Sequence, residues 1–116
     1  MTGTYAEIDQ AEMERALAPL RRAEPAIAER ALDLASETLI AEAQAEAPVA
    51  TGFLQGSHSV DTPRKGERVL GVNAGYALAV HETHPTKSRW FINTISRRAK
   101  EVFRGALQLA TREVRP

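Results

Sequence analysis

Two prolines, Pro25 and Pro48, bracket an alanine-rich segment that constrains this chain more than any other feature of its sequence. Proline fits the first position of a helix, where its missing amide hydrogen has no partner to lose, and it stops a helix farther along. We therefore expect a long helix from Pro25 to about Ala47. Its apolar residues form two strips roughly 140° apart, and we favour contact with another chain for part of them. The first strip holds Ile27, Ala31, Leu34, Thr38, Ala41 and Ala45, and the second holds Leu32, Leu39 and Ala43.

Helical periodicity also marks both ends of the chain. Asp9 can cap a short helix that runs to about Arg22. The segment from Ser88 to Glu113 predicts the longest helix, with an apolar stripe on one side and basic residues on the other. The stripe consists of Ile92, Ile95, Ala99, Val102, Phe103, Ala106, Leu107, Ala110 and Val114. The other side consists of Arg97, Lys100, Arg104, Gln108, Arg112 and Arg115.

Between the long helices the pattern changes to that of strands. Ser57 to Thr62 and Arg68 to Val72 predict two short strands, joined by a turn at Pro63 to Gly66. Tyr76 to Glu82 alternates poorly for a strand, so we expect a short helix there. The sequence thus predicts a single α+β domain over residues 1–116, with a small antiparallel hairpin flanked by two long helices and a short N-terminal helix.

The composition removes several classes of protein. The chain has no cysteine, which excludes disulfide frameworks, thiolate zinc sites and cysteine nucleophiles. The first residues lack the basic and apolar regions of a signal peptide. No apolar run approaches the roughly 18 to 20 residues that span a bilayer, so we expect a soluble protein with no membrane partner.

Charge is distributed unevenly along a chain whose net charge is zero. Residues 1–50 carry 10 acidic and 4 basic side chains, whereas residues 51–116 carry 5 acidic and 11 basic ones. Such asymmetry can indicate contact with nucleic acid or a head-to-tail contact between copies. Two solvated helix faces of opposite sign would give the same pattern.

Candidate chemical groups are few. His81 and His84, with Glu82 and His58, suggest a metal site, but zinc usually needs three or four well-placed ligands. The serines, histidine and aspartate within Ser57 to Asp61 are sequence neighbours only, and a catalytic triad requires spatial geometry. We therefore expect packed or surface histidines, no metal, no cofactor and no catalytic residues.

Three motifs that follow one another from the end of the long helix onward resemble those of a known protein family. They are Ala47-Pro48-Val49-Ala50-Thr51-Gly52-Phe53-Leu54 with Ser57, then Gly71-Val72 with Tyr76-Ala77 and Val80-His81-Glu82, then His84-Pro85 leading into Trp90-Phe91-Ile92. In order and spacing they resemble a family of small tailed-phage proteins known as tail-completion, head–tail joining (neck) or minor capsid proteins. The resemblance covers about Ile27 to Val114. Thr83-His84 and Trp90 depart from the glycine-threonine and proline that members often have there.

The resemblance implies a virion structural protein that has no enzymatic activity and is assembled in the host cytoplasm. It implies a homo-oligomeric ring, commonly of about six copies, between a head-closure or connector protein beneath the portal and a tail terminator or tail-tube protein. The particle can be an infectious phage, a prophage or a gene-transfer particle. The basic helix then faces either a neighbouring subunit or, without sequence specificity, the DNA in the channel. The contact residues we expect, besides the hairpin, are Leu32, Leu39, Thr51, Gly52, Leu54, Tyr76, Trp90, Phe91, Arg97 and Arg104.

A rival hypothesis comes from the basic C-terminal helix alone. Arg97, Arg98, Lys100 and Arg104 would suit a small host-encoded nucleic-acid-binding or regulatory protein. Such proteins usually carry a clear positive excess, and the zero net charge of this chain argues against the rival.

Overall fold

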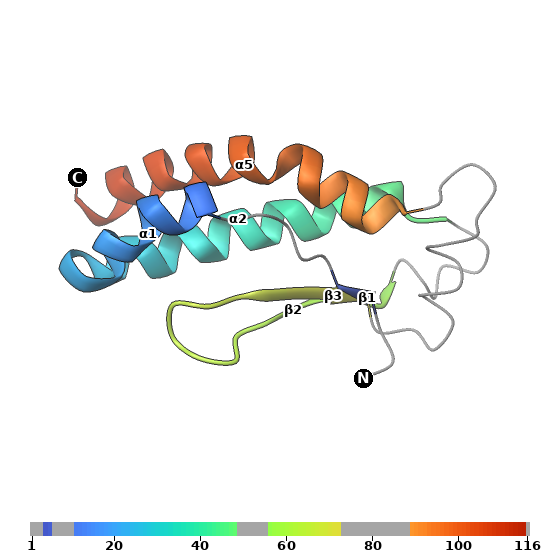
Figure 1. Ribbon diagram of the computed structural model, residues 1–116, viewed down its shortest axis with the longest axis horizontal. Helices are drawn as coiled ribbons and strands as arrows, with labels where there is room; N and C mark the ends of the chain where they lie inside the picture. The colour runs from blue at the N-terminus through green and yellow to red at the C-terminus, as the bar shows by residue number, and fades with distance from the viewer. Residues whose placement is uncertain (1–3, 6–10, 49–55, 73–88, 116) are drawn as a thin grey trace.

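The computed structural model describes residues 4–5, 11–48, 56–72 and 89–115. Three helices and a small antiparallel sheet make up this part of the chain, which confirms the α+β class predicted from the sequence (Figure 1). In chain order the elements are β1 (Thr4–Tyr5), α1 (Ala11–Ala23), α2 (Pro25–Glu46), β2 (His58–Asp61), β3 (Val69–Val72) and α5 (Trp90–Val114).

Proline sets both ends of α2, as predicted. Pro25 is the first residue of the helix, and α2 ends at Glu46, two residues before Pro48. The Glu24 amide donates to the Leu20 carbonyl at 2.8 Å and so closes α1, while the Glu24 carbonyl accepts the amides that open α2. A single residue therefore separates the two helices, and α1 folds back beside α2 (Figure 1).

The core lies between α2 and α5, which run antiparallel (Figure 1). Small side chains from both helices are buried along this contact, and such side chains allow two helix backbones to approach closely. They are Ala28, Ala31, Ala35 and Ala43 of α2 and Ala99, Ala106 and Ala110 of α5. Phe91, Ile27 and Val72 are the largest fully buried side chains among the described residues and supply bulk that the alanines lack.

The two apolar strips predicted for α2 share the buried side of the helix unequally. In the first strip, Ile27 and Ala31 are buried. Farther along the same strip, Thr38, Ala41 and Ala45 are exposed. The buried row instead continues from Ala31 through the residues at every fourth position, Ala35, Leu39 and Ala43. A step of four residues turns about 40° around a helix. The buried side of α2 therefore rotates along its length from the first predicted strip to the second.

The sheet has the order β1-β3-β2, and both pairings are antiparallel. His58 lies opposite Val72 and Asp61 opposite Val69, which confirms the predicted hairpin within one residue at each end of β2. β2 packs against α2. Alternate residues of the hairpin, including Leu70 and Val72, face the helices, whereas Ser59, Asp61 and Val69 form an outer side. The two-residue strand β1 was not predicted, because it is too short to show a periodicity.

The helix expected from Tyr76 to Glu82 lies outside the described residues. In the part of the chain that the structure describes, none of the helices combines the length and the apolar character needed to cross a membrane.

Candidate functional site

A cluster of charged residues attaches the hairpin to α2. The side chain of Arg68 is only 5% exposed, and its Nη2 lies 2.7 Å from Glu29 Oε2 and 2.8 Å from Asp33 Oδ1. Glu29 and Asp33 are four residues apart, so both carboxylates lie on one side of α2. The hydrogen bond from Arg68 holds the pKa of Glu29 below its ordinary value. A buried arginine with two carboxylate partners thus fixes the start of β3.

The hairpin turn is held from a second direction by α1. Arg21 donates to the carbonyl oxygen of Gly66 from Nε at 3.1 Å and from Nη2 at 2.9 Å, while the Gly66 amide donates to Glu29. Gly66 has a φ of +84°, and a Cβ there would lie 3.3 Å from Arg21 Nε. Both the left-handed backbone and this close approach favour glycine. We call Arg21, Glu29, Asp33, Gly66 and Arg68 the hairpin clasp.

Further ion pairs join α2 and its N-terminal flank to α5. They are Arg98 with Glu42 at 2.6 Å, Arg30 with Glu113 at 2.6 Å and Arg115 with Glu24 at 3.3 Å. The Arg98 guanidinium lowers the pKa of Glu42 through its hydrogen bond. Together with the clasp, these pairs show where much of the uneven charge of the sequence goes. In all of these interhelical and clasp ion pairs except Arg30–Glu113, an acidic group of the first half of the chain meets a basic group of the second half inside one subunit.

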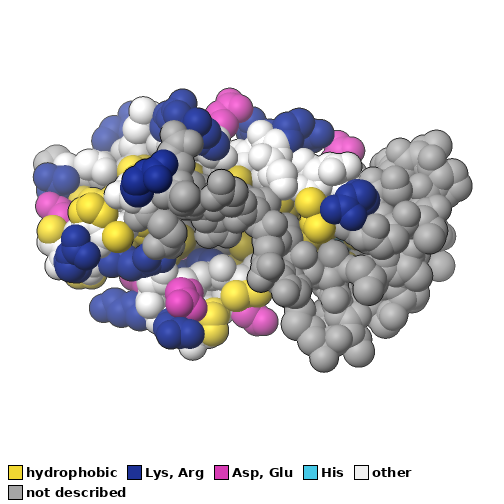
Figure 2. All heavy atoms as spheres, in the orientation of Figure 1, with side chains coloured by type: hydrophobic (Ala, Val, Ile, Leu, Met, Phe, Trp, Pro, Cys, Tyr) yellow, Lys and Arg dark blue, Asp and Glu magenta, His cyan; other side chains and the backbone are white. Residues whose placement is uncertain are grey.

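Basic side chains that remain exposed gather along α5. We call Arg97, Lys100, Arg104, Gln108 and Arg112 the outer face of α5; all five are exposed, as predicted. Figure 2 shows Lys and Arg side chains along the edge of the molecule that α5 forms. The two glutamates of this helix are engaged with other arginines, Glu101 with Arg98 at 2.6 Å and Glu113 with Arg30. Basic side chains thus outnumber acidic ones along this helix surface, where the 76% exposed Glu101 lies between Arg97 and Arg104 in the sequence.

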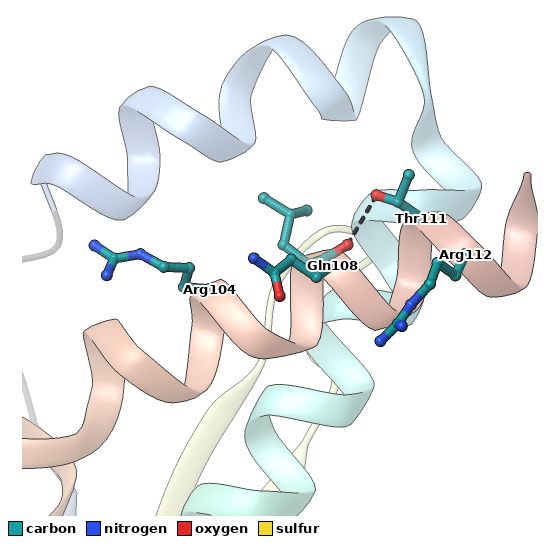
Figure 3. Close-up of a pocket in the computed structure, with 5 residues that line it drawn as sticks. Arg104, Gln108, Thr111 and Arg112 are labelled. Carbon is teal, nitrogen blue, oxygen red and sulfur yellow. Dashed lines mark hydrogen bonds between the residues drawn. The ribbon is translucent and has the colours of Figure 1, made fainter.

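An open groove of about 620 Å³ runs along part of this face. Arg104, Leu107, Gln108, Thr111 and Arg112 line it, and we call it the α5 groove. Figure 3 shows Gln108 between Arg104 and Arg112, with the Thr111 hydroxyl donating to the carbonyl of Leu107. Among the described residues, the lining holds two guanidinium groups and an amide and no carboxylate, beside a surface that is mostly apolar. The charged groups at its edge suit an anion.

The predicted contact residues fall into three groups. Leu39, Trp90 and Phe91 are 8%, 4% and 0% exposed and belong to the core of the subunit. Leu32 is half-buried against that core. The structure therefore gives the three buried side chains a packing role inside the subunit, and they do not enter the surfaces we propose below.

Two other predicted contact residues, Arg97 and Arg104, lie together on the outer face of α5. The remaining contact predictions concern Thr51, Gly52, Leu54 and Tyr76, which lie outside the described residues.

The histidine of the hairpin is packed against aromatic rings. Trp90 Nε1 donates to His58 Nε2 at 3.2 Å, and the His58 ring centroid lies 5.8 Å from that of Phe91. His58 thus links β2 to the first turn of α5, while His81 and His84 lie outside the described residues. Within the described ranges, no group of three or more His, Cys, Asp or Glu side chains is placed to hold a metal ion.

Sequence reasoning missed the hairpin clasp and the polar lining of the α5 groove. The spacing of Glu29 and Asp33 signals a shared helix side, but no sequence pattern says that Arg68 reaches them across the fold. Gln108 and Arg112 were placed on the exposed side of α5 without any indication that a groove joins them to Arg104.

The chain matches no family model, and it has no significant match among curated proteins or solved structures. The functional assignment therefore depends on the motifs of the sequence and on the surfaces of the fold.

Proposed function

We propose that this chain is a structural, non-enzymatic subunit of the head–tail junction of a tailed phage or phage-like gene-transfer particle. It forms a ring of about six copies that connects the portal or connector above it to the tail tube below. The observation that carries the proposal is the ordered series of three motifs from Ala47 to Ile92, which resembles tail-completion and neck proteins.

The motifs occupy particular places in the chain. In the sequence the first follows the end of α2, the second begins with Gly71 and Val72 of β3, and the third ends in the first turn of α5.

The exposed surfaces of the helices and the hairpin also support the proposal. A head-to-tail ring needs two different surfaces on each subunit. The outer side of the hairpin presents Ser59, Asp61 and the 41% exposed Val69. The uncovered side of α2 presents Thr38 and Ala41 beside Glu37. These two surfaces differ in element and in chemistry, as a heterologous contact requires.

The test is the mass of the purified full-length protein in solution, measured by light scattering at low and physiological salt. We expect a closed ring, either alone or on a tail-tube or connector template. Val69→Lys should lower the assembled mass, because it places a charge on the outer side of the hairpin. Leu109→Lys is the matched control, since Leu109 is 39% exposed on α5, and it should assemble normally.

Equal loss of assembly in both variants would remove the hairpin from the interface. A strict monomer that ignores every template would overturn the ring. The exposed basic residues of α5 would then favour the second candidate, a small host nucleic-acid-binding or regulatory protein.

A further inference from the structure

We infer that the α5 groove and the adjoining outer face of α5 bind the phosphate backbone of double-stranded DNA without reading its sequence. The binding surface is inferred from the charges and the geometry of the described residues. Only the source of the DNA, a genome that crosses the head–tail junction, rests on the proposed function.

The first step of the argument is that arginines elsewhere in the fold are already engaged. Arg30, Arg68 and Arg98 each hold a carboxylate at 2.6 to 2.7 Å. Arg104 and Arg112 are exposed and form no ion pair within the part of the chain that the structure describes. The fold therefore separates arginines that stabilise it from arginines that are available to a partner.

The second step is the geometry of the available donors. Arg104 and Arg112 are eight residues apart, which corresponds to about 12 Å along a helix, and Arg97 extends the row to about 22 Å. Double-stranded DNA presents one negative charge for roughly every 1.7 Å of its axis, so on the order of a dozen phosphates lie within the length of such a row, and those on the near side of the duplex can contact it. A planar guanidinium binds phosphate through paired hydrogen bonds, and the Gln108 amide adds a neutral donor.

The third step concerns the ordinary alternative, a solvated charged helix. Such faces usually mix both signs at spacings of three or four residues. On α5, Glu101 lies four residues after Arg97 and three before Arg104, but its carboxylate pairs with Arg98 at 2.6 Å, and Glu113 pairs with Arg30. None of the described residues that line the groove carries a carboxylate. Within the described ranges, the charges of Arg104 and Arg112 are thus uncompensated, which favours a long anionic partner over solvent alone.

The experiment measures binding of the full-length protein to a labelled duplex of mixed sequence, about 25 base pairs long, by fluorescence anisotropy between about 50 and 200 mM salt. We expect the logarithm of the affinity to fall linearly with the logarithm of the salt concentration. Arg104→Gln with Arg112→Gln should weaken binding and reduce the slope by about 1.8, because each phosphate contact contributes about 0.9. Glutamine keeps a polar, helix-compatible side chain while removing the charge.

The matched control is Arg64→Gln with Lys65→Gln, which removes the same charge from two exposed residues of the hairpin turn. It should leave the affinity and the slope close to those of the unmodified protein. Equal weakening in both double variants would show that only the net charge matters and would overturn the site. Absence of DNA binding by the unmodified protein would overturn it as well.

Assembly measured in parallel separates this inference from the proposed function. Loss of DNA binding with a normal ring mass supports the DNA surface. Loss of ring mass with unchanged DNA binding assigns the groove to a neighbouring subunit and overturns the inference, while the ring stands. A monomer whose DNA binding depends on Arg104 and Arg112 supports the surface and overturns the ring.

Discussion

Arg68 and the arginines of the α5 groove show two opposite uses of the same side chain. Arg68 is 5% exposed and bonded to Glu29 and Asp33, whereas Arg104 and Arg112 are exposed and have no carboxylate beside them among the described residues of their groove. A buried guanidinium that lost its carboxylates would be costly, so Arg68 is tied to its place in the fold. An exposed guanidinium has no such constraint and can exchange water for a phosphate.

This difference changes the meaning of the uneven charge along the sequence. Acidic residues of α2 are largely paired with arginines from the hairpin and α5 inside the subunit. The asymmetry is therefore in good part a set of contacts between distant segments of one chain. The basic charge that remains exposed lies in part on the outer face of α5, and removal of arginines from each group tests the distinction.

The largest effect is expected from Arg68→Ala. The substitution leaves Glu29 without its arginine and breaks the attachment of β3 to α2, so we expect a loss of about 2 to 4 kcal/mol in the free energy of unfolding. Chemical denaturation followed by circular dichroism measures this loss. Arg64→Ala is the control, because the Arg64 side chain is 75% exposed and its pair with Glu67 is worth less than about 1 kcal/mol. Similar losses in the two variants would show that the clasp does not hold the hairpin.

A smaller loss is expected from Gly66→Ala. Alanine would be strained in the left-handed backbone conformation of residue 66, and its methyl group would lie 3.3 Å from Arg21 Nε. We therefore expect a loss of about 1 to 2 kcal/mol in the free energy of unfolding. Gly105→Ala should have the opposite sign, with a gain of about 0.5 to 1 kcal/mol. Gly105 lies inside α5, and a Cβ there meets nothing within 4 Å. Thermal unfolding of both variants gives the comparison, and a tolerated alanine at position 66 would mean that Arg21 does not constrain the turn.

Local features of the sequence predicted the elements of the fold well. Pro25 and Pro48 set the ends of α2, and the alternation around the turn set the hairpin register, because both signals act within a few residues. Contacts between distant segments were not predictable in the same way. The two apolar strips of α2 were predicted, but not which part of each would be buried inside the subunit, and Thr38 and Ala41 are exposed.

The site was predicted less completely than the fold. Exposure of Arg97 and Arg104 followed from the helical period, whereas Leu39, Trp90 and Phe91 were assigned to contacts with other chains and lie in the core. An apolar or aromatic residue on a helix suits either place, and only the packing of the whole subunit decides between them. The partners of Arg68 depend on the same packing, since residue 68 is 35 positions from Asp33.

The smallest effect on stability is expected from the groove variant, Arg104→Gln with Arg112→Gln. Neither arginine stabilises the fold through an ion pair with the described residues, so the free energy of unfolding should change by less than about 0.5 kcal/mol. The same denaturation measurement used for Arg68→Ala checks this value. A loss comparable to that of Arg68→Ala would erase the distinction between the two groups of arginines. An unchanged free energy of unfolding together with weakened DNA binding would instead mean that the groove arginines bind DNA. It would also mean that these exposed charges contribute little to the stability of the fold.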